Sequence, residues 1–419
     1  MPRLRLNRLR LNRSVASSRG GALLLLAALG GCATATSRAR ASGTDWPWTV
    51  PATIADTIQT QIIAPGVRWH HLVRIGAPGL MRIEVLDVDL AACITPQALK
   101  GAPTAVGRTT TSRFLANLPA ADRGIATINA DFFSFTPDGV PVNLLVADGR
   151  LISGPVERPV FAMDSAGRPY IGRFSAAGAI VNPRGVRVPI GSWNRPSARL
   201  VGLVDAAWGQ TLDTIARPGA LQLIPVSGGT ATAKRYRIAT LPSYHSGLAR
   251  GDTLMLIQSD RASLLVGDTV RVEPSLAPFL PTQAVGGFPL LVADSAYSAT
   301  LDKDGAVSFR DRNPRSAIGV GAKGRRLLLA VIDGRQPRYS IGMTTRETAQ
   351  LLRDLGAREA MNLDGGGSSA LAVRDPATGA VRVLNKPSDP VERPVADVLA
   401  LTGRCAAASP AVNGTATGR

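Results

Sequence analysis

Short apolar segments that end in glycine, proline or aspartate–glycine turns limit how this 419-residue chain can fold. The chain contains 43 glycines and 30 prolines, and both residue types interrupt regular structure and form turns. The segments between them are rich in valine, isoleucine and leucine, which favours strands over long helices. Because 45% of the residues are apolar, the chain can bury a full core. We therefore predict an α+β fold, a β-rich single domain around a mixed, twisted sheet with few helices.

Several segments show the pattern of a strand. Residues 81–90 alternate apolar and polar side chains over most of their length, as a strand with one wet face does. Residues 327–332 are apolar throughout and lead into an Asp-Gly pair, as expected of a buried central strand. Further strands are predicted at residues 124–128 and 359–363.

One helix has clear start and stop signals. Thr344 and Glu347 have the spacing of a capping box, and Gly356 follows the last apolar residue of the predicted helix. A repeated Gly-Asp-Thr turn, at residues 251–253 and 267–269, precedes strand-like runs. Strands therefore outnumber helices in the prediction.

The first 31 residues have the composition of a signal peptide. Six arginines precede an apolar run, residues 22–29, that is too short to span a bilayer. Small residues directly precede Cys32, which resembles the acylated cysteine of a bacterial lipobox; an ordinary signal peptide with a chance cysteine is the alternative. Ala33 resembles a signal for sorting to an outer membrane. We therefore predict an exported periplasmic or cell-surface lipoprotein, held on a membrane, such as the outer membrane, by its lipid anchor.

The composition of the remaining chain predicts a tether, a folded domain and a tail. Residues 32–60, rich in small residues and arginine, are predicted to be a flexible tether, and residues 406–419 a disordered tail. The folded domain is predicted over residues 61–405. It contains Cys93 and Cys405, for which a disulfide and two isolated buried thiols are equally compatible with an oxidising compartment.

The formal net charge of +18 falls to about +12 when the arginines of the signal peptide are removed. A basic surface suits anionic partners such as phosphodiesters, acidic glycans or lipid headgroups. The charge is scattered, without basic runs or interleaved aromatic residues, so no nucleic acid partner is predicted. Nothing in the sequence predicts an oligomeric state.

Clusters of polar residues follow the predicted strands, where loops bring side chains together at the rim of a sheet. Each cluster is a weak signal alone. The clusters are residues 129–133 with Asn143 downstream, residues 312–319, residues 331–334, and the turn Asn-Leu-Asp-Gly-Gly-Gly-Ser-Ser at residues 362–369.

In this order, these clusters resemble the phosphodiester glycosidase family. Residues 286–291, 342–347, 385–389 and 392–394 extend the resemblance. It implies a hydrolase that cleaves a glycosidic bond, with a carbohydrate or sugar-1-phosphodiester substrate from the cell envelope or an exogenous glycan. Cleavage of the P–O bond and a non-catalytic glycan-binding lipoprotein are the alternatives.

The glycine turn carries the strongest functional signal. Its glycines permit positive φ and expose backbone N–H groups that can bind an anionic oxygen. The turn residues predicted to bind substrate are Gly365, Gly366, Gly367, Ser368 and Ser369. An ordinary hairpin turn is the alternative, but it rarely needs so many glycines.

Carboxylates are the candidate catalytic groups, because hydrolysis of a glycosidic bond ordinarily uses two of them. We predict Asp364 as the nucleophile or general base, with Glu347 or Asp333 as its partner. Glu347 is explained equally well by the capping box. An ordinary turn is the alternative for Asp333, although the family resemblance favours a functional role, and a cap on the turn that follows is the alternative for Asp131.

The remaining candidates would hold the substrate. Arg315 offers a planar fork that matches a phosphate, although an ion pair with a nearby aspartate competes with this role. Asn129, Asn143 and Asn362 would hold sugar hydroxyls or orient carboxylates, unless they only support turns. The histidines lack metal-ligand spacing. No cofactor is therefore predicted, although the aspartates could hold a calcium or magnesium ion.

Overall fold

Strands greatly outnumber helices in the structure, a computed structural model. It describes residues 46–136, 138–195, 201–208, 220–230, 233–241, 254–257, 263–303 and 307–403. The residues from Pro47 onward form one compact unit. The predicted signal peptide, Cys32, Cys405 and the predicted tail lie outside the described residues.

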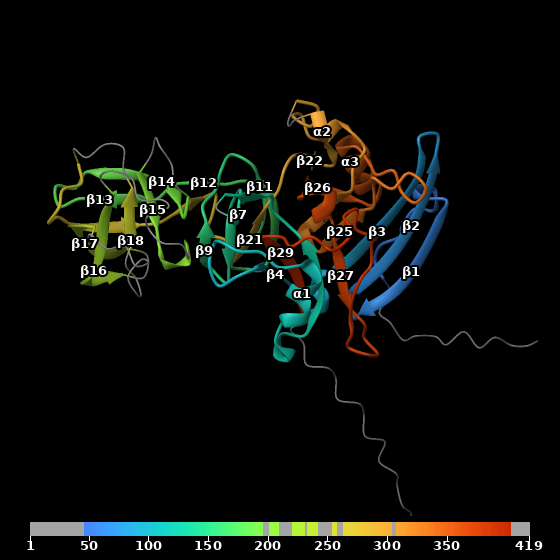
Figure 1. Cartoon of the computed structure of the whole chain (residues 1–419), viewed down its shortest axis with the longest axis horizontal. Coiled ribbons are helices and arrows are strands. Elements are labelled where there is room, and N and C mark those ends of the chain that lie inside the picture. The colour runs from blue at the N-terminus through green and yellow to red at the C-terminus, as the bar shows by residue number, and fades with distance from the viewer. Residues whose placement is uncertain are drawn as a thin grey trace, which may run out of the picture. The chain divides into compact units, whose positions relative to one another are not determined.

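An eight-stranded sheet forms the largest layer, and its neighbouring strands run antiparallel. The first three strands lie on one side of β25 (Figure 1). In order across the sheet, the strands are β1 (Thr57–Ala64), β2 (Val67–Gly76), β3 (Gly79–Asp89), β25 (Arg326–Ile332), β24 (Arg315–Gly321), β26 (Ala357–Asn362), β22 (Leu290–Ala293) and β23 (Ala296–Tyr297).

Strand β25 is buried on both faces, as its apolar sequence predicted. Alternate side chains of a strand point to opposite faces. Leu328, Ala330 and Ile332 join a core that includes the apolar side of helix α3 (Thr345–Asp354). The intervening side chains of β25 join a second core on the other face of the sheet.

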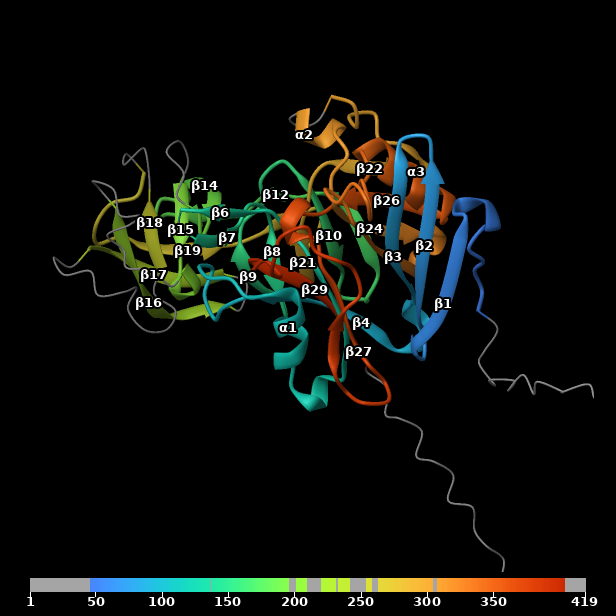
Figure 2. The same ribbon diagram turned by 45° about the vertical axis from the view of Figure 1, so that its right-hand side comes forward.

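That second core lies between the eight-stranded sheet and a five-stranded antiparallel sheet. Helix α1 (Thr111–Asn117) packs against this second sheet (Figure 2). Its signal was missed, although Thr110 caps it in the ordinary way. In order, the strands of the second sheet are β28 (Val381–Val383), β27 (Leu371–Arg374), β5 (Gly124–Asn129), β29 (Asp397–Gly403) and β4 (Ile94–Lys100).

A third sheet extends the same core, to which Phe161 and Val285 contribute. The third sheet contains β11 (Pro169–Arg173), β10 (Pro159–Met163), β21 (Gln283–Gly286), β8 (Leu145–Ala147) and β9 (Arg150–Ser153). Several small elements are also present: β6 (Phe133–Phe135), β7 (Asp138–Pro141), β12 (Ser175–Ala176), β20 (Leu276–Ala277) and helix α2 (Val307–Arg310).

Between β11 and β21 the chain forms a closed barrel with its own core. Strands β14 and β15 of the barrel pair in parallel, which makes its sheet mixed. The predicted strand-rich fold with a mixed sheet and few helices is therefore confirmed. In order, the barrel strands are β13 (Ala179–Val181), β14 (Arg187–Trp193), β15 (Val201–Val204), β18 (Leu254–Ile257), β16 (Leu221–Thr230), β17 (Ala233–Thr240) and β19 (Thr269–Glu273).

Secondary structure begins earlier than the predicted boundary at residue 61. Strand β1 starts at Thr57, and Ile54 before it is only 4% exposed because it packs into the core on the α3 side of the sheet. The other predicted boundaries remain predictions. Among the described residues, no helix has the length and apolar character needed to cross a bilayer.

Cys93 is disulfide-bonded. Strand β29 pairs with β4 so that Gly403 lies opposite Ile94, the residue after Cys93. The predicted partner, Cys405, lies outside the described residues, so the Cys93–Cys405 pairing remains a prediction.

Candidate active site

Strand ends from both stacked sheets converge on one region. In the large sheet, Arg315 at the start of β24 pairs with Ile332 at the end of β25, and Asn362 ends the adjoining β26. In the second sheet, the last residue of β5, Asn129, pairs with Val398 near the start of β29. The polar clusters that the sequence places after these strands therefore meet.

Asn129 ties these ends together. Its side-chain amide donates to the carbonyl oxygen of Asp364 at 2.7 Å, and its oxygen accepts from the Ser316 hydroxyl at 2.7 Å and from the Ala370 amide at 3.1 Å. All of these contacts are buried or partly buried. Asn129 thus holds both ends of the glycine turn, as the turn-supporting alternative predicted.

The glycine turn requires its glycines. Gly366 has a φ of +63°, where side chains are strained, and it opens a single 3-10 turn, Gly366–Ser368. A methyl group on Gly365 would lie 2.8 Å from the Pro314 carbonyl oxygen, and one on Gly367 would overlap Asp389 and Arg393. Charged side chains therefore approach the backbone as closely as glycine allows.

Two arginines flank this turn. The guanidinium of Arg335 lies 3.1 Å from where a Cβ of Gly366 would stand, and Arg393 lies against Gly367. Arg393 is paired with Asp389 at 2.7 Å, and Arg335 Nε donates to Asn313 at 3.0 Å. Sequence reasoning gave neither arginine a role. Arg393 lies in a segment that carried the family resemblance, which was the available signal.

Asp364 lies at the start of the turn. Although part of the residue is exposed to solvent, protein surrounds its carboxyl group, and this burial raises the pKa of Asp364 to about 6. The Ser368 hydroxyl, the charge of Arg393 and the Gly365 amide act in the opposite direction. The Ser368 hydroxyl lies close enough to lower the pKa of Asp364, but its geometry is not that of a normal hydrogen bond. Asp364 is therefore mostly ionised at neutral pH but can accept a proton.

Several buried polar atoms of the turn lack a hydrogen-bond partner within the described part of the chain. They are the hydroxyls of Ser368 and Ser369, each on a residue 1% exposed, and the side-chain oxygen of Asn362. The amide of Asn362 instead donates to the Phe288 and Leu363 carbonyl oxygens. Burying an unpaired polar group costs about 1–3 kcal/mol. These atoms can exchange hydrogen bonds with polar atoms of a ligand.

Asp333 belongs to the same cluster but is 1% exposed. Its carboxylate accepts from the side-chain amide of Asn385 at 3.1 Å and from the Lys386 backbone amide at 3.0 Å. Burial raises the pKa of Asp333 to about 6, against these hydrogen bonds. Asn385 also donates to the Ser369 carbonyl oxygen at 3.0 Å, so it bridges Asp333 and the glycine turn.

Asp131 lies deeper. Its carboxylate accepts from the backbone amides of Phe132 at 2.8 Å and Asn143 at 2.5 Å, as the capping alternative predicted. Burial, together with the charge of Asp397, raises the pKa of Asp131 well above its ordinary value. Burial likewise raises the pKa of Asp397 to about 7, and the charge of Asp364 adds to it. Sequence reasoning missed Asp397, which opens β29.

Asn143 also supports the backbone. Its side-chain amide donates to the Pro159 carbonyl oxygen at 2.8 Å, and its side-chain oxygen accepts from the Val156 amide at 3.0 Å. The residue is fully buried. These contacts hold neighbouring loops in place and match the turn-supporting alternative.

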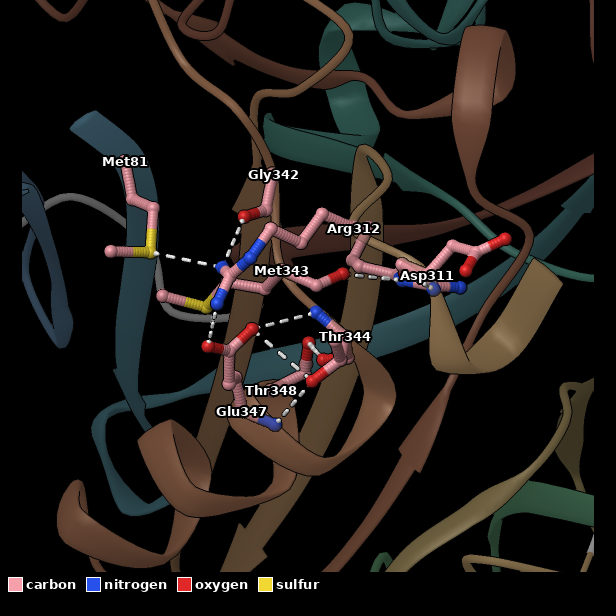
Figure 3. Close-up of polar contacts among 9 residues, drawn as sticks. Met81, Asp311, Arg312, Gly342, Met343, Thr344, Glu347 and Thr348 are labelled. Atoms are coloured by element: carbon pink, nitrogen blue, oxygen red, sulfur yellow. Dashed lines mark hydrogen bonds and ion pairs between the residues drawn. The ribbon is translucent and has the colours of Figure 1, made fainter. Parts of the chain in front are cut away.

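Glu347 forms the predicted capping box at the start of α3 (Figure 3). Its Oε2 accepts from the Thr344 amide at 2.9 Å, and Thr344 Oγ1 accepts from the Glu347 amide at 3.1 Å. Its other oxygen forms an ion pair with Arg312, which also donates to the Gly342 carbonyl oxygen at 3.2 Å. Both carboxylate oxygens therefore have partners in the framework of the helix.

Arg315 is only 4% exposed and points into the framework as well. It donates to the backbone carbonyl oxygens of Met343 at 3.0 Å, Phe309 at 3.1 Å and Asp311 at 2.7 Å. Burial and the charge of Arg335 lower the pKa of Arg315 to about 10. Arg315 thus holds the loops before β24 and α3, and the arginines that reach the turn are Arg335 and Arg393.

No group of three or more metal-ligating side chains gathers within the described ranges. The predicted independence from a cofactor, and the option of a divalent cation, both remain predictions.

Comparison with known proteins agrees with the motifs. Residues 256–402 match the model of the phosphodiester glycosidase family. A shorter stretch of 91 residues is 37% identical to the SPbeta prophage-derived uncharacterized protein YomE of Bacillus subtilis, and it covers 22% of this chain and 13% of that protein.

Solved structures share the fold. A hypothetical protein from Synechocystis aligns with a TM-score of 0.65 at 22% identity, over 84% of this chain and 64% of its own. A protein of Burkholderia pseudomallei described as exported aligns with a TM-score of 0.56 at 23% identity, over 78% of this chain and 75% of its own. This chain therefore spans less than two thirds of the first relatives that it matches.

The family match includes Asp333, Asp364 and the glycine turn, and the solved structures extend the shared fold to most of the chain. The chain therefore resembles the phosphodiester glycosidases, as its motifs predicted, and residues 256–402 carry the resemblance.

Proposed function

We propose that this chain is a hydrolase that cleaves the glycosidic bond of a sugar-1-phosphodiester or a related glycan linkage. One observation carries the proposal: a glycine turn, whose buried hydroxyls lack partners among the described residues, lies between Arg335 and Arg393 and begins at a carboxylate, Asp364, with a raised pKa. The match of residues 256–402 to the phosphodiester glycosidases supports a glycosidase rather than another kind of hydrolase.

The arrangement suits an anionic leaving group. A phosphate monoester is a weak base compared with a sugar alkoxide, so its departure needs charge stabilisation more than protonation. Arg335 and Arg393, which flank the turn, would supply that stabilisation. Ser368 and Ser369 would donate their hydroxyls to oxygens of the sugar or the phosphate, because both hydroxyls lack partners within the described part of the protein.

Asp364 is the best placed of the candidate carboxylates. The carboxylates of Asp131, Asp333 and Glu347 have hydrogen-bond partners in the framework, whereas Asp364 opens the glycine turn, where the charge of Arg393 acts on its carboxyl group. In the proposed reaction Asp364 either removes a proton from the attacking water or attacks the anomeric carbon itself. The first route inverts the configuration of the sugar and the second retains it.

Asp333 would act as a positioning residue. Its hydrogen bonds to Asn385 and the Lys386 amide hold the segment that runs on to Asp389 and Arg393. Because Asn385 also binds the Ser369 carbonyl oxygen, loss of the Asp333 carboxylate would loosen the turn.

We further propose that the protein is exported and held on a membrane through an acylated Cys32. The apolar run before this cysteine and the small residues next to it support the proposal. The Burkholderia relative described as exported agrees with it. Mass spectrometry of the mature N-terminus would check the acylation, since an unmodified Cys32 would contradict it.

The experiment that tests the reaction is hydrolysis in ¹⁸O-labelled water of a panel of hexose 1-(methyl phosphate) diesters. The expected products are a labelled sugar and an unlabelled methyl phosphate, because the bond that breaks joins the anomeric carbon to oxygen. Label on the phosphate would show P–O cleavage instead and would overturn the glycosidase assignment.

Matched p-nitrophenyl hexosides, run alongside the diesters, test the preference for a phosphate leaving group. We expect higher kcat/KM for the diester than for the aryl glycoside of the same sugar. Binding of the diesters without turnover across the panel would favour the glycan-binding alternative.

A further inference from the structure

A row of arginines lies across the outer face of the barrel. Val181 on β13 pairs with Arg187 on β14 and with Arg271 on β19, and Arg271 in turn pairs with Arg235 on β17. Residues directly opposite each other in a sheet point to the same face. All three arginines are exposed. Arg187, Arg271 and Arg235 therefore form one row across neighbouring strands, here called the arginine row.

The arginine row lines a groove of about 510 Å³. Like charges placed directly opposite each other, as Arg235 and Arg271 are, destabilise a sheet unless an anion offsets them. Glu273 offsets part of the charge, because it pairs with Arg187 at 2.8 Å and with Arg271 at 3.1 Å. Exposed Arg237 adds a further positive charge two residues along β17. The described part of this face therefore has an excess of positive charge.

Aliphatic side chains are exposed on turns at one end of the same face. Val186, on the turn between β13 and β14, is 43% exposed; Leu265 and Val266, on the turn before β19, are 49% and 56% exposed. A hydrogen bond of 2.8 Å from the Asn182 side chain to the Ser263 carbonyl oxygen joins the two turns. The apolar tips thus lie together, beside the arginine row.

We propose that this end of the barrel docks on the surface of a lipid bilayer rich in anionic lipids. Arginines at the level of the headgroups attract their phosphates, and short aliphatic tips enter the boundary between headgroups and acyl chains. An acidic polymer in water would match the charge, but it would not explain the exposed aliphatic side chains. The proposal is independent of the glycosidase activity.

Docking can be measured as partition of the full-length protein onto vesicles. Vesicles of phosphatidylcholine alone are compared with vesicles that contain about one third phosphatidylglycerol. Any contribution of the residues before Trp46 is the same in every variant, so the change between variants isolates the barrel. We expect stronger partition onto the anionic vesicles and a decline as salt is added.

The Arg235→Gln/Arg271→Gln variant should lose roughly 25-fold in partition onto anionic vesicles, at about fivefold for each arginine. A Leu265→Ser/Val266→Ser variant should lose about tenfold or more through its apolar surface. The matched controls, Arg358→Gln on an exposed ion pair of β26 and Ile75→Ser at a 70% exposed position of β2, should change partition little.

Hydrogen exchange identifies the face that docks. Backbone amides of residues 182–187 and 263–271 should exchange more slowly with anionic vesicles than with phosphatidylcholine vesicles. Circular dichroism confirms that each variant is folded. Equal partition of the wild type onto both vesicle types, or equal losses in the control variants, would overturn the proposal. So would protection of these amides by a soluble acidic polysaccharide but not by vesicles.

Discussion

The buried aspartates at the two ends of strand β25 have pKa values shifted in opposite directions. At its start, Arg326 binds Asp87 through parallel hydrogen bonds of 2.8 and 2.7 Å, and both side chains are almost fully buried. Burial alone would raise the pKa of Asp87, but the neighbouring His70 ring, 3.8 Å away, and the hydrogen bonds from Arg326 bring it below its ordinary value. This end carries a neutralised pair.

Just past the other end of β25, Asp333 is equally buried, but two amides and the Tyr339 hydroxyl are its hydrogen-bond donors. Its pKa therefore rises to about 6, and that of Asp364 on the nearby glycine turn rises as far. A buried carboxylate in a full ion pair stays ionised and depends on its partner, whereas one kept close to its titration range can take part in chemistry. Under the proposed function, one end of the strand therefore serves the structure and the other lies beside the reaction.

The largest expected effect is on turnover. Asp364→Asn should lower kcat toward a sugar-1-phosphodiester by about 10²–10⁴-fold, because the carboxylate that moves the proton or attacks the sugar is lost. Steady-state kinetics measures it. Asp375→Asn, on the exposed turn after β27, is the matched control and should leave kcat unchanged. Equal turnover by the Asp364 variant would remove this residue from the mechanism.

Breaking the neutralised pair should affect stability instead. Arg326→Met leaves Asp87 buried without its main cation, which should cost about 3–5 kcal/mol in the free energy of unfolding. Urea denaturation followed by circular dichroism measures the loss. Arg325→Met removes an arginine that pairs with Asp89 but is half exposed, and should cost about 1 kcal/mol or less. Similar losses in both variants would contradict the distinction.

The raised pKa of Asp364 should oppose stability. Its pKa is about 6 in the folded protein and near 3.8 when unfolded, so the folded protein holds the proton more tightly. The resulting penalty is absent below pH 3.8, grows as the pH rises toward 6 and is complete above it. Asp364→Asn should therefore stabilise the protein at pH 8 by up to about 3 kcal/mol, less where solvent reaches the carboxyl.

Thermal melts of wild type and variant between pH 4 and pH 8 test this expectation, since the advantage of the variant should shrink toward pH 4. The kcat of the wild type should rise with pH through about 6, as Asp364 loses its proton. A variant that is less stable than wild type at pH 8 would show that Asp364 is a structural carboxylate like Asp87.

The smallest effect is expected at the rim of the site. Arg335→Met should raise KM for a sugar-1-phosphodiester by about tenfold, because one charged hydrogen bond to phosphate is lost. It should hardly change KM for the matched aryl glycoside, which has no phosphate. Arg338→Met, an exposed arginine of the same loop, is the control. Equal rises for both substrates would mean that Arg335 only supports the turn.

Features that depend on residues close together in the sequence could be predicted from the sequence. The apolar run of β25, the capping box of α3 and the glycine turn are set by side-chain periodicity, short hydrogen bonds and backbone freedom. The family resemblance, confirmed over residues 256–402, rests on the same local segments. The sequence also placed polar clusters at strand ends, which do meet.

Only the tertiary structure decided which of those polar side chains are engaged elsewhere. Asn129 binds Asp364 across 235 positions of the chain, and Arg315 uses its donors on carbonyl oxygens of the loops before β24 and α3. Burial and hydrogen-bond partners depend on segments that are distant in the chain, so no local pattern reports them. The sequence by itself thus determined the strand-rich fold and the turn, while packing determined that Arg335 and Arg393 flank it.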